Sequence, residues 1–283
     1  MFIRTLSGAA YVAILVGFFF LRTVSPLFFS AFIWFLSFMG AFEVARAIKP
    51  FSFKGGFAVA IVFGATFVPV YAVFENFFTA GALFALIYAV LFCAAILIYL
   101  AQKKLFGQYA VDGVFPVLYP AILLLTMLII NDMGGDRSLI ALVLVFVISP
   151  CADVFAYLVG MTYNKIVKGK AKKLCPTLSP KKTVAGAIGG VIGGAVGGVL
   201  VCVVFGEKAD ALVRFMPAII YFAIVGLLGS VLTEIGDLYE SGIKRKAGIK
   251  DMGKIMPGHG GVMDRIDGTL FCSALVCLAF TLL

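Results

Sequence analysis

Residues 183–205 read TVAGAIGGVIGGAVGGVLVCVVF and contain no charged side chain. An α-helix rises about 1.5 Å per residue, so roughly 20 apolar residues cross the hydrocarbon core of a bilayer. The stretch therefore predicts a membrane-spanning helix. The whole chain has the same character, because 63% of its 283 residues are hydrophobic, only 13% are charged and its mean hydropathy is +1.12. Soluble domains carry about 25% charged residues, so this composition excludes a soluble globular protein.

Glycines recur at every fourth position of this stretch. They form two adjacent series, Gly186, Gly190, Gly194 and Gly198 beside Gly189, Gly193 and Gly197. Such faces of small residues let helix backbones approach closely in lipid, either within one chain or in a homodimer. A phosphate-cradling glycine loop is the alternative, but that motif follows a strand and ends in Gly-Lys-Ser or Gly-Lys-Thr. We predict no strand before the stretch and find no such ending after it, which favours helix packing.

Apolar segments of similar length lie on both sides of this one. Because a backbone in lipid must satisfy its own hydrogen bonds, we predict an all-α polytopic membrane protein with about nine transmembrane helices. A long loop precedes the last helix. The predicted segments are 6–21, 26–45, 55–74, 77–101, 114–130, 139–161, 183–205, 215–236 and 269–283.

The basic residues predict how these segments are oriented. Of the 23 Lys and Arg residues, 18 fall in even-numbered loops between the predicted helices and four in odd-numbered loops. Basic loops tend to stay in the cytoplasm, so the N-terminus and the even loops are predicted to be cytoplasmic and the C-terminus outside. The same rule accounts for the net charge of +9, and we expect no nucleic-acid partner.

The predicted cytoplasmic loop 237–268 is unusually polar for such a chain. It reads DLYESGIKRKAGIKDMGKIMPGHGGVMDRIDG and holds the only histidine. Its glycine-rich turn 257–261 can bring backbone N–H groups close to an anion. Basic side chains surround this turn, which is typical of sites that handle phosphate groups. They are Lys244, Arg245, Lys250, Lys254 and Arg265. His259 by itself is compatible with proton transfer or with a structural hydrogen bond.

Acidic residues stand at both ends of this loop and within membrane segments. Glu234, Asp237 and Glu240 follow one another at three-residue steps, and they form one polar stripe if their helix continues past the membrane. Asp264 and Asp267 precede the last segment. Mg²⁺ binds one or two carboxylates together with substrate phosphates, so the acids suit that ion. The alternative is a set of solvated helix ends whose acids pair with neighbouring lysines. Acids within membrane segments also invite a functional hypothesis, and here these are Glu43, Asp153 and Glu234.

The stretch from Ser241 to Asp267 resembles the signature of phosphatidate cytidylyltransferases, also called CDP-diacylglycerol synthases. The matching positions are Ser241, Lys244, Arg245, Lys250, Asp251, Pro257, Gly258, His259, Gly260, Gly261, Asp264, Arg265 and Asp267. Two further pieces resemble the family, the Asp-x-x-Ala-Tyr stretch at residues 153–157 and the Ser-Pro-x-Lys-Thr box at residues 179–183. One position departs, because the family's box usually continues with a glutamate where this chain has Ala185. The departure puts the role of the box in doubt more than that of the signature.

The resemblance implies that CTP and phosphatidic acid in the bilayer give CDP-diacylglycerol and pyrophosphate. It also implies a multi-pass enzyme of the cell inner (plasma) membrane whose active site faces the cytoplasm. The chain would then consist of N-terminal membrane helices, residues 1–138, and a catalytic membrane region, residues 139–283, with cytoplasmic loops 162–182 and 237–268.

The chemistry of the residues supplies a mechanism compatible with this reaction, which we state as a hypothesis. Asp237 and Asp264 would hold Mg²⁺, alone or with a second cation. Groups on the nucleotide or its phosphates would be bound by Ser179, Lys181, Lys182, Thr183, Gly260 and Gly261. Catalytic roles would fall to Lys244, Arg245, Lys250, Asp251, His259, Arg265 and Asp267. Asp153 would face the same cavity from within the membrane.

Other functions remain open from the residues alone. The chain could use CTP on another lipid, as a polyprenol kinase or a related lipid-phosphate cytidylyltransferase, and a kinase would release CDP instead of pyrophosphate. A transporter also carries acids within helices, but it tends to place them at the bilayer midplane in repeated halves. This chain instead concentrates its charge in two loops and shows no repeat. A structural membrane scaffold would not need the glycine turn flanked by carboxylates.

Overall fold

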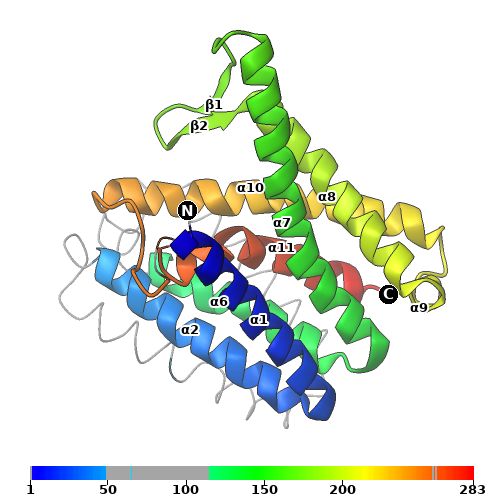
Figure 1. Cartoon of the computed structure of the whole chain (residues 1–283). Coiled ribbons are helices and arrows are strands. Elements are labelled where there is room, and N and C mark those ends of the chain that lie inside the picture. Colours follow the sequence, from blue (N-terminus) through cyan, green and yellow to red (C-terminus); the bar gives the residue numbers. More distant parts are fainter. Residues whose placement is uncertain (1, 49–64, 66–114, 257, 259) are drawn as a thin grey trace, which may run out of the picture. The chain divides into compact units, whose positions relative to one another are not determined.

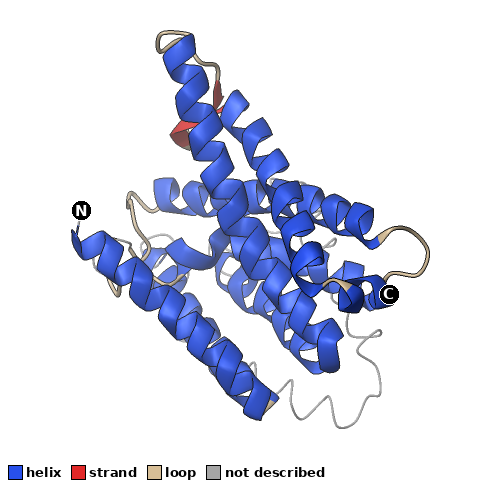
Figure 2. Cartoon of the chain, turned by 45° about the vertical axis from the view of Figure 1, so that its right-hand side comes forward, coloured by secondary structure: helices blue, strands red, loops and turns tan. Residues whose placement is uncertain are grey.

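A computed structural model describes residues 2–48, 65, 115–256, 258 and 260–283 (Figure 1). Across these residues the chain is mostly helical, and its two strands form one small hairpin (Figure 2). Five of the described helices are long and apolar enough to cross a membrane. The chain is therefore a multi-pass membrane protein.

The described helices are α1 (Phe2–Val24), α2 (Pro26–Ile48), α6 (Phe115–Asp132), α7 (Gly135–Ile166), α8 (Val184–Phe205), α9 (Glu207–Leu212), α10 (Ala218–Lys246) and α11 (Met263–Thr281). The strands are β1 (Lys173–Cys175) and β2 (Ser179–Thr183). Seven of the nine predicted segments coincide with α1, α2, α6, α7, α8, α10 and α11. The other two, 55–74 and 77–101, lie outside the described residues except for Ala65. The number of spans and their orientation stay predictions.

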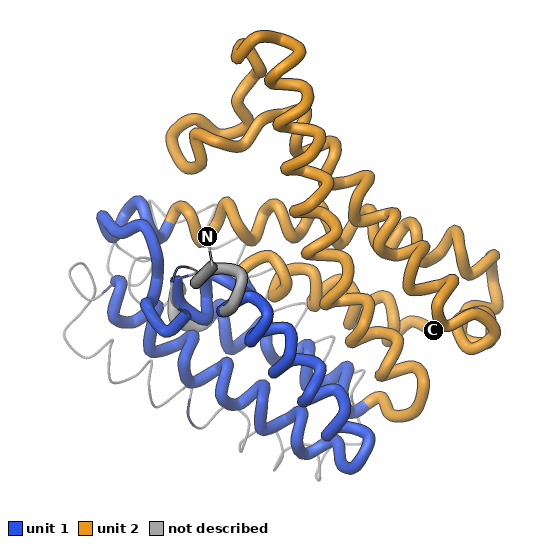
Figure 3. The backbone as a smooth tube through the Cα atoms, viewed as in Figure 1, with its two compact units in different colours: residues 1–132, 243–266 blue, residues 133–242, 267–283 orange. Residues whose placement is uncertain are grey.

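Two compact packing units make up the chain (Figure 3). Unit 1 comprises residues 1–132 and 243–266, and unit 2 comprises residues 133–242 and 267–283. Helices α10 and α11 are each divided between the units: the end of α10 and the beginning of α11 belong to unit 1, and the rest of both helices belongs to unit 2. These units describe packing, so the functional division predicted at residue 138 stays a prediction.

Helix α8 of unit 2 packs closely against two helices through its glycines. A Cβ atom at Gly189 or Gly193 would lie 2.6 Å from Val159 or 2.5 Å from Phe155, both on α7. A Cβ atom at Gly194 or Gly198 would collide with the backbone of α10. The predicted close packing is confirmed, and it takes place within the chain.

The segment between α7 and α8 folds differently from the predicted loop 162–182. Helix α7 continues to Ile166, and β1 and β2 then pair antiparallel with Lys173 opposite Thr183. The expectation that no strand precedes the glycine stretch is therefore wrong, since β2 runs directly into α8. Thr183 joins the two elements, because its Oγ1 accepts a hydrogen bond from the Gly186 N–H at 3.0 Å and caps the helix. A five-residue strand that contains a proline carries too weak a pattern to be recognised in the sequence.

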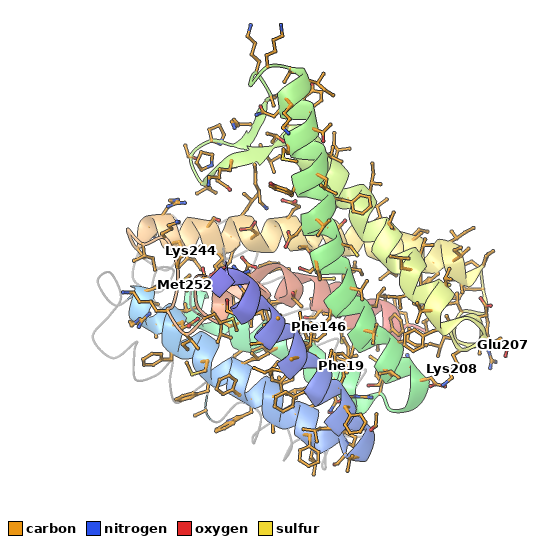
Figure 4. The ribbon with its side chains drawn as sticks, viewed as in Figure 1. Phe19, Phe146, Glu207, Lys208, Lys244 and Met252 are labelled. Atoms are coloured by element: carbon orange, nitrogen blue, oxygen red, sulfur yellow. The ribbon has the colours of Figure 1, made fainter. Side chains whose placement is uncertain are left out.

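An exposed ion pair joins the beginning of α7 to α9, the short helix that follows the end of α8. Lys208 of α9, labelled in Figure 4, lies 2.9 Å from Asp136 in the first turn of α7. The pairing agrees with an antiparallel arrangement of α7 and α8.

Unit 1 packs α2 against α1 and α6. Its core holds Phe29, Ile33, Leu124 and Ile130, all fully buried. Asn131 of α6 ties the three helices together at one end. Its amide nitrogen donates to the Pro26 carbonyl and its side-chain oxygen accepts from Arg22 at 2.8 Å.

The polar stretch 237–268 is only partly a loop. Helix α10 continues to Lys246 and α11 begins at Met263, so the connection itself runs from 247 to 262. The acidic stripe was predicted on the condition that its helix continues past the membrane segment. The helix does continue, and Glu234, Asp237 and Glu240 all lie on α10.

Candidate active site

Lys182 is the centre of an ion cluster in unit 2. It lies in β2, and its Nζ is 2.5 Å from Glu234 Oε2 and 2.6 Å from Asp237 Oδ2. Burial lowers the pKa of Lys182, but the carboxylates of Asp237 and Glu234 outweigh burial, so this pKa lies above its ordinary value. The side chain is 22% exposed. Lys182 is thus a charged group at neutral pH, held by two acids of α10.

Two more carboxylates act on the same cluster. Asp153 of α7 lies within electrostatic range of Asp267 at the start of α11, of Asp237, of Lys182 and of Glu234. Four elements, β2, α7, α10 and α11, therefore bring one ammonium group and four carboxylates together within unit 2.

A cavity of about 350 Å³ opens beside Lys182. Three lysines line it, Lys173, Lys181 and Lys182, together with Thr183 and the carboxylates Asp153 and Glu234. Exposed apolar side chains of α7, Tyr157 and Met161, complete the wall. The cavity thus offers positive charge and a hydroxyl group to phosphates next to a surface that suits lipid.

The donor set fits Mg²⁺ that arrives with a polyphosphate. Among the described residues, no group of three or more His, Cys, Asp or Glu side chains is arranged to hold a metal ion by itself. Mg²⁺ usually keeps several waters and binds one or two carboxylates plus substrate phosphates, so it does not require such a cage. The sequence also left open that these acids pair with lysines at solvated helix ends, and the pairing of Glu234 and Asp237 with Lys182 agrees with that alternative.

Asp264 organises the connection 247–262 in unit 1. Its Oδ1 accepts from Lys244 Nζ at 2.9 Å, and its Oδ2 accepts from the backbone N–H groups of Met252 at 2.8 Å and Gly261 at 2.7 Å. Lys244 and Met252 are labelled in Figure 4. The Asp264 side chain is only 5% exposed. One carboxylate therefore joins the end of α10, the middle of the connection and the start of α11.

The glycine turn has the backbone that its residues predict. Gly258 and Gly260 have φ of 78° and 88°, which favour glycine, and Met256 and Gly260 exchange two backbone hydrogen bonds. The N–H of Gly261 points at an anion, but this anion is the chain's own Asp264. Pro257 and His259 lie outside the described residues, so the role of His259 stays a prediction.

A family model described as the cytidylyltransferase family matches residues 3–283. The chain belongs to the cytidylyltransferase family. Phosphatidate cytidylyltransferases are among its curated relatives. The protein of Mycobacterium bovis is 37% identical over 132 residues, 47% of this chain and 38% of the relative. That of Brucella abortus is 34% identical over 200 residues, 70% and 66%, and that of Thermotoga maritima 30% over 156 residues, 55% and 53%. These alignments cover less than two thirds of each relative's length.

This member of the family exposes several of the basic residues that the sequence singled out. Arg245, Lys250 and Arg265 are exposed in unit 1, as is Asp251, and Lys181 is exposed in unit 2. Their exposure leaves them accessible to dissolved anions, whereas Lys182 and Lys244 are largely covered. The structure thus divides the predicted phosphate ligands into exposed groups and groups held by carboxylates.

Glu234 and Glu43 received no role in the predicted site. Glu234 was recognised as an acid of a membrane segment, but its pairing with Lys182 was not foreseen. Its position three residues before Asp237 is a signal that could have found it. Glu43 accepts hydrogen bonds from the backbone at the start of α11, more than 200 residues away along the chain. No local pattern could have revealed that contact.

Proposed function

We propose that this chain is a membrane nucleotidyltransferase that makes CDP-diacylglycerol and pyrophosphate from CTP and phosphatidic acid. The carrying observation is the cavity of unit 2, which places three lysines and two carboxylates beside exposed apolar side chains of α7. A lipid phosphate and a nucleotide triphosphate need that combination. The relatives' names support the same activity.

The reaction exchanges one phosphorus–oxygen bond for another. An oxygen of the lipid phosphate attacks the α-phosphorus of CTP, a new pyrophosphate linkage forms, and the bond to the β-phosphate breaks to release pyrophosphate. Negative charge builds up around the α-phosphorus and on the leaving group. Preorganised positive groups stabilise such charge, and we assign this role to Lys244, Arg245, Lys250 and Arg265. Asp251 and Asp267 orient them, while residues 179–183 cover the nucleotide.

Mg²⁺ would offset the charge of the triphosphate and of the leaving pyrophosphate. We propose Asp237 of unit 2 and Asp264 of unit 1 as carboxylates that would bind it, alone or with a second cation. Each of these carboxylates already balances the ammonium group of a lysine, Lys182 or Lys244. A cation at either carboxylate would compete with that lysine, whose ammonium group would then be available to phosphate.

We place the site on the cytoplasmic side of the inner membrane. The segment from Lys165 to Lys182 holds seven lysines and no acidic residue. Such segments tend to remain in the cytoplasm, where CTP is made available to the enzyme.

The activity is tested with purified protein in vesicles that contain phosphatidic acid. Adding CTP and Mg²⁺ should release pyrophosphate and form CDP-diacylglycerol, and removing divalent cations with EDTA should stop both until Mg²⁺ is restored. Release of CDP with a phosphorylated lipid would instead identify a kinase and overturn the proposal. Activity that persists in EDTA would overturn the metal assignment.

Asp264→Asn sharpens the test, because it removes one charge and retains the shape of the side chain. We expect pyrophosphate release to fall by about 10²-fold or more, since charge next to the reacting phosphates is lost. Asp136→Asn is the matched control, an exposed acid that pairs with Lys208 away from the predicted residues. Equal rates for the two variants would contradict the role of Asp264.

A further inference from the structure

Glu43 is a buried acid of α2 that the chemistry above does not use. It is 1% exposed. Its Oε1 accepts from the N–H of Val262 at 3.1 Å, and its Oε2 accepts from the N–H of Met263 at 3.0 Å. A buried carboxylate is costly unless it is hydrogen-bonded, and two backbone donors satisfy it here. All of these residues belong to unit 1.

These two donors stand at the beginning of α11, which starts at Met263. The first N–H groups of a helix have no partner within the helix and are usually capped by a nearby side chain. Gly261 and Val262, the residues just before α11, have no side-chain oxygen that could do so. Glu43 supplies the missing acceptor from another helix, and its negative charge also suits a helix N-terminus.

Two glycines show how closely the connection lies against this acid. A Cβ atom at Gly253 or at Gly261 would collide with the Glu43 carboxylate. Gly261 is also the residue whose N–H binds Asp264. Its lack of a side chain therefore serves the approach of Glu43 on one side while its N–H serves Asp264.

A second contact from α2 reinforces the first. Arg46, almost one turn after Glu43, donates to the carbonyl of Met252 at 3.0 Å. The N–H of the same Met252 donates to Asp264. Helix α2 thus holds the connection at its middle, through Met252, and at its end, through Val262. Met252 is itself a partner of Asp264, and Val262 follows the partner Gly261.

We propose that Glu43 is a positioning residue, which caps α11 from α2 and thereby fixes Asp264 and its partner Lys244 for the reaction. The inference rests on the proposed function for the roles of Asp264 and Lys244. Glu43 itself touches no substrate, because it is fully enclosed by the protein. It acts through the backbone of residues 261–263.

The variant Glu43→Gln tests this role. Its amide oxygen can accept from one N–H group, but its NH₂ group faces the other, so one donor loses its partner. Hydrogen exchange should speed up at the amides of residues 252–263 and stay unchanged in α8. The kcat for pyrophosphate release should fall by about tenfold or more, because a small displacement of reacting groups is costly. The KM for phosphatidic acid should stay near the wild-type value.

Two further variants separate positioning from folding. Glu43→Asp retains the charge on a shorter side chain, and we expect its kcat to lie between those of wild type and Glu43→Gln. Ser37→Ala is the matched control, a fully buried polar residue of the same helix. It should alter neither the exchange at 252–263 nor the kcat. Rates are expressed per folded protein, so a simple loss of folded protein does not lower kcat.

Three results would overturn the inference. The first is unchanged exchange at residues 252–263 in Glu43→Gln. The second is faster exchange with an unchanged kcat, which would leave Glu43 a structural cap without influence on the reaction. The third is equal loss of kcat in Ser37→Ala. A wild-type protein that releases no pyrophosphate would refute the proposed function, and the exchange measurement would then still decide whether Glu43 holds the connection.

Discussion

At the scale of single residues, the predicted ligands for phosphate and metal bind one another. Lys182 pairs with Glu234 and Asp237, and Lys244 pairs with Asp264. Each lysine is therefore held in place before any substrate arrives, so less side-chain freedom is lost on binding. The same pairing makes the availability of each ammonium group depend on its carboxylate partners.

Lys182→Met tests this dependence. We expect a higher KM for CTP and a free energy of unfolding lower by about 1–2 kcal/mol, because two carboxylates lose a charged hydrogen-bond donor. The raised pKa of Lys182 means that its contribution is complete below the ordinary lysine pKa, about 10.4, and disappears only as the pH rises past the raised value. The difference in stability between variant and wild type should thus stay constant from neutral pH to about pH 9. Thermal unfolding in detergent at several pH values measures it.

Lys170→Met is the control for that experiment. It removes an exposed lysine of the same segment that lies outside the proposed machinery. Its KM and stability should match the wild type. A similar change in both variants would show that the total positive charge of the segment matters, and not the pairing of Lys182.

At the scale of elements, the glycines of α8 let α7 and α10 pack directly against its backbone. Small residues allow van der Waals packing at short range, which drives helix association in lipid where the hydrophobic effect does not. The close approach has a further effect on the site. It brings Asp153 of α7 and Glu234 of α10 close to the N-terminal turns of α8, where both acids line the cavity.

Gly198→Ala should destabilise the protein through this contact. An added Cβ atom would meet the Phe222 carbonyl of α10, which cannot move independently of its helix. We expect a loss of about 3 kcal/mol, typical of overpacking in a tight interface. Gly17→Ala is the matched control, because an added Cβ atom meets nothing within 4 Å there. Thermal unfolding in detergent compares the two variants, and equal unfolding temperatures would refute the packing role of Gly198.

At the scale of the whole molecule, the chain passes from one packing unit to the other more than once. Residues 1–132 begin unit 1, residues 133–242 build most of unit 2, and residues 243–266 return to unit 1. The signature stretch thus contributes to both, since Ser241 and Asp267 belong to unit 2 while Lys244 and Asp264 belong to unit 1. A contiguous sequence motif here specifies parts of two structural units.

The orientation in the membrane is a property of the molecule as a whole. Helix α8 has 22 residues, so it is about 33 Å long and can separate the two sides of a bilayer. We expect Lys170→Cys to react with a membrane-impermeant maleimide only after the cells are opened, and Lys208→Cys to react in intact cells. Both are exposed, and the six native cysteines are replaced beforehand. Labelling of both positions from one side would contradict the orientation.

The sequence predicts well whatever depends on composition and on short periods. Apolar length located α7, α8 and α10, and the four-residue glycine period identified close packing in α8. Helix ends were harder, because α10 continues for ten residues beyond the predicted membrane segment with polar residues that suit a solvated helix. The β1–β2 hairpin was missed, since three and five residues with Pro180 carry little strand signal.

The site was predicted in its residues more than in its contacts. Lys182 and Asp264 were recognised through their motifs, but their partners could not be assigned from spacing. The pair of Lys182 and Glu234 spans 52 positions, and that of Glu43 and Met263 spans 220. Such contacts depend on how helices pack, which a single sequence does not encode in any local pattern.

The collision between Glu43 and any side chain at Gly253 or Gly261 has a consequence for how this protein can be recombined. These three positions therefore depend on one another, although most of the chain separates the first from the other two. A hybrid that joins a foreign N-terminal half to residues 115–283 should reach the full rate only if the foreign half brings a carboxylate to the place of Glu43. Selection of such recombinants for activity should therefore recover an acid at this position repeatedly, whichever other segments are exchanged.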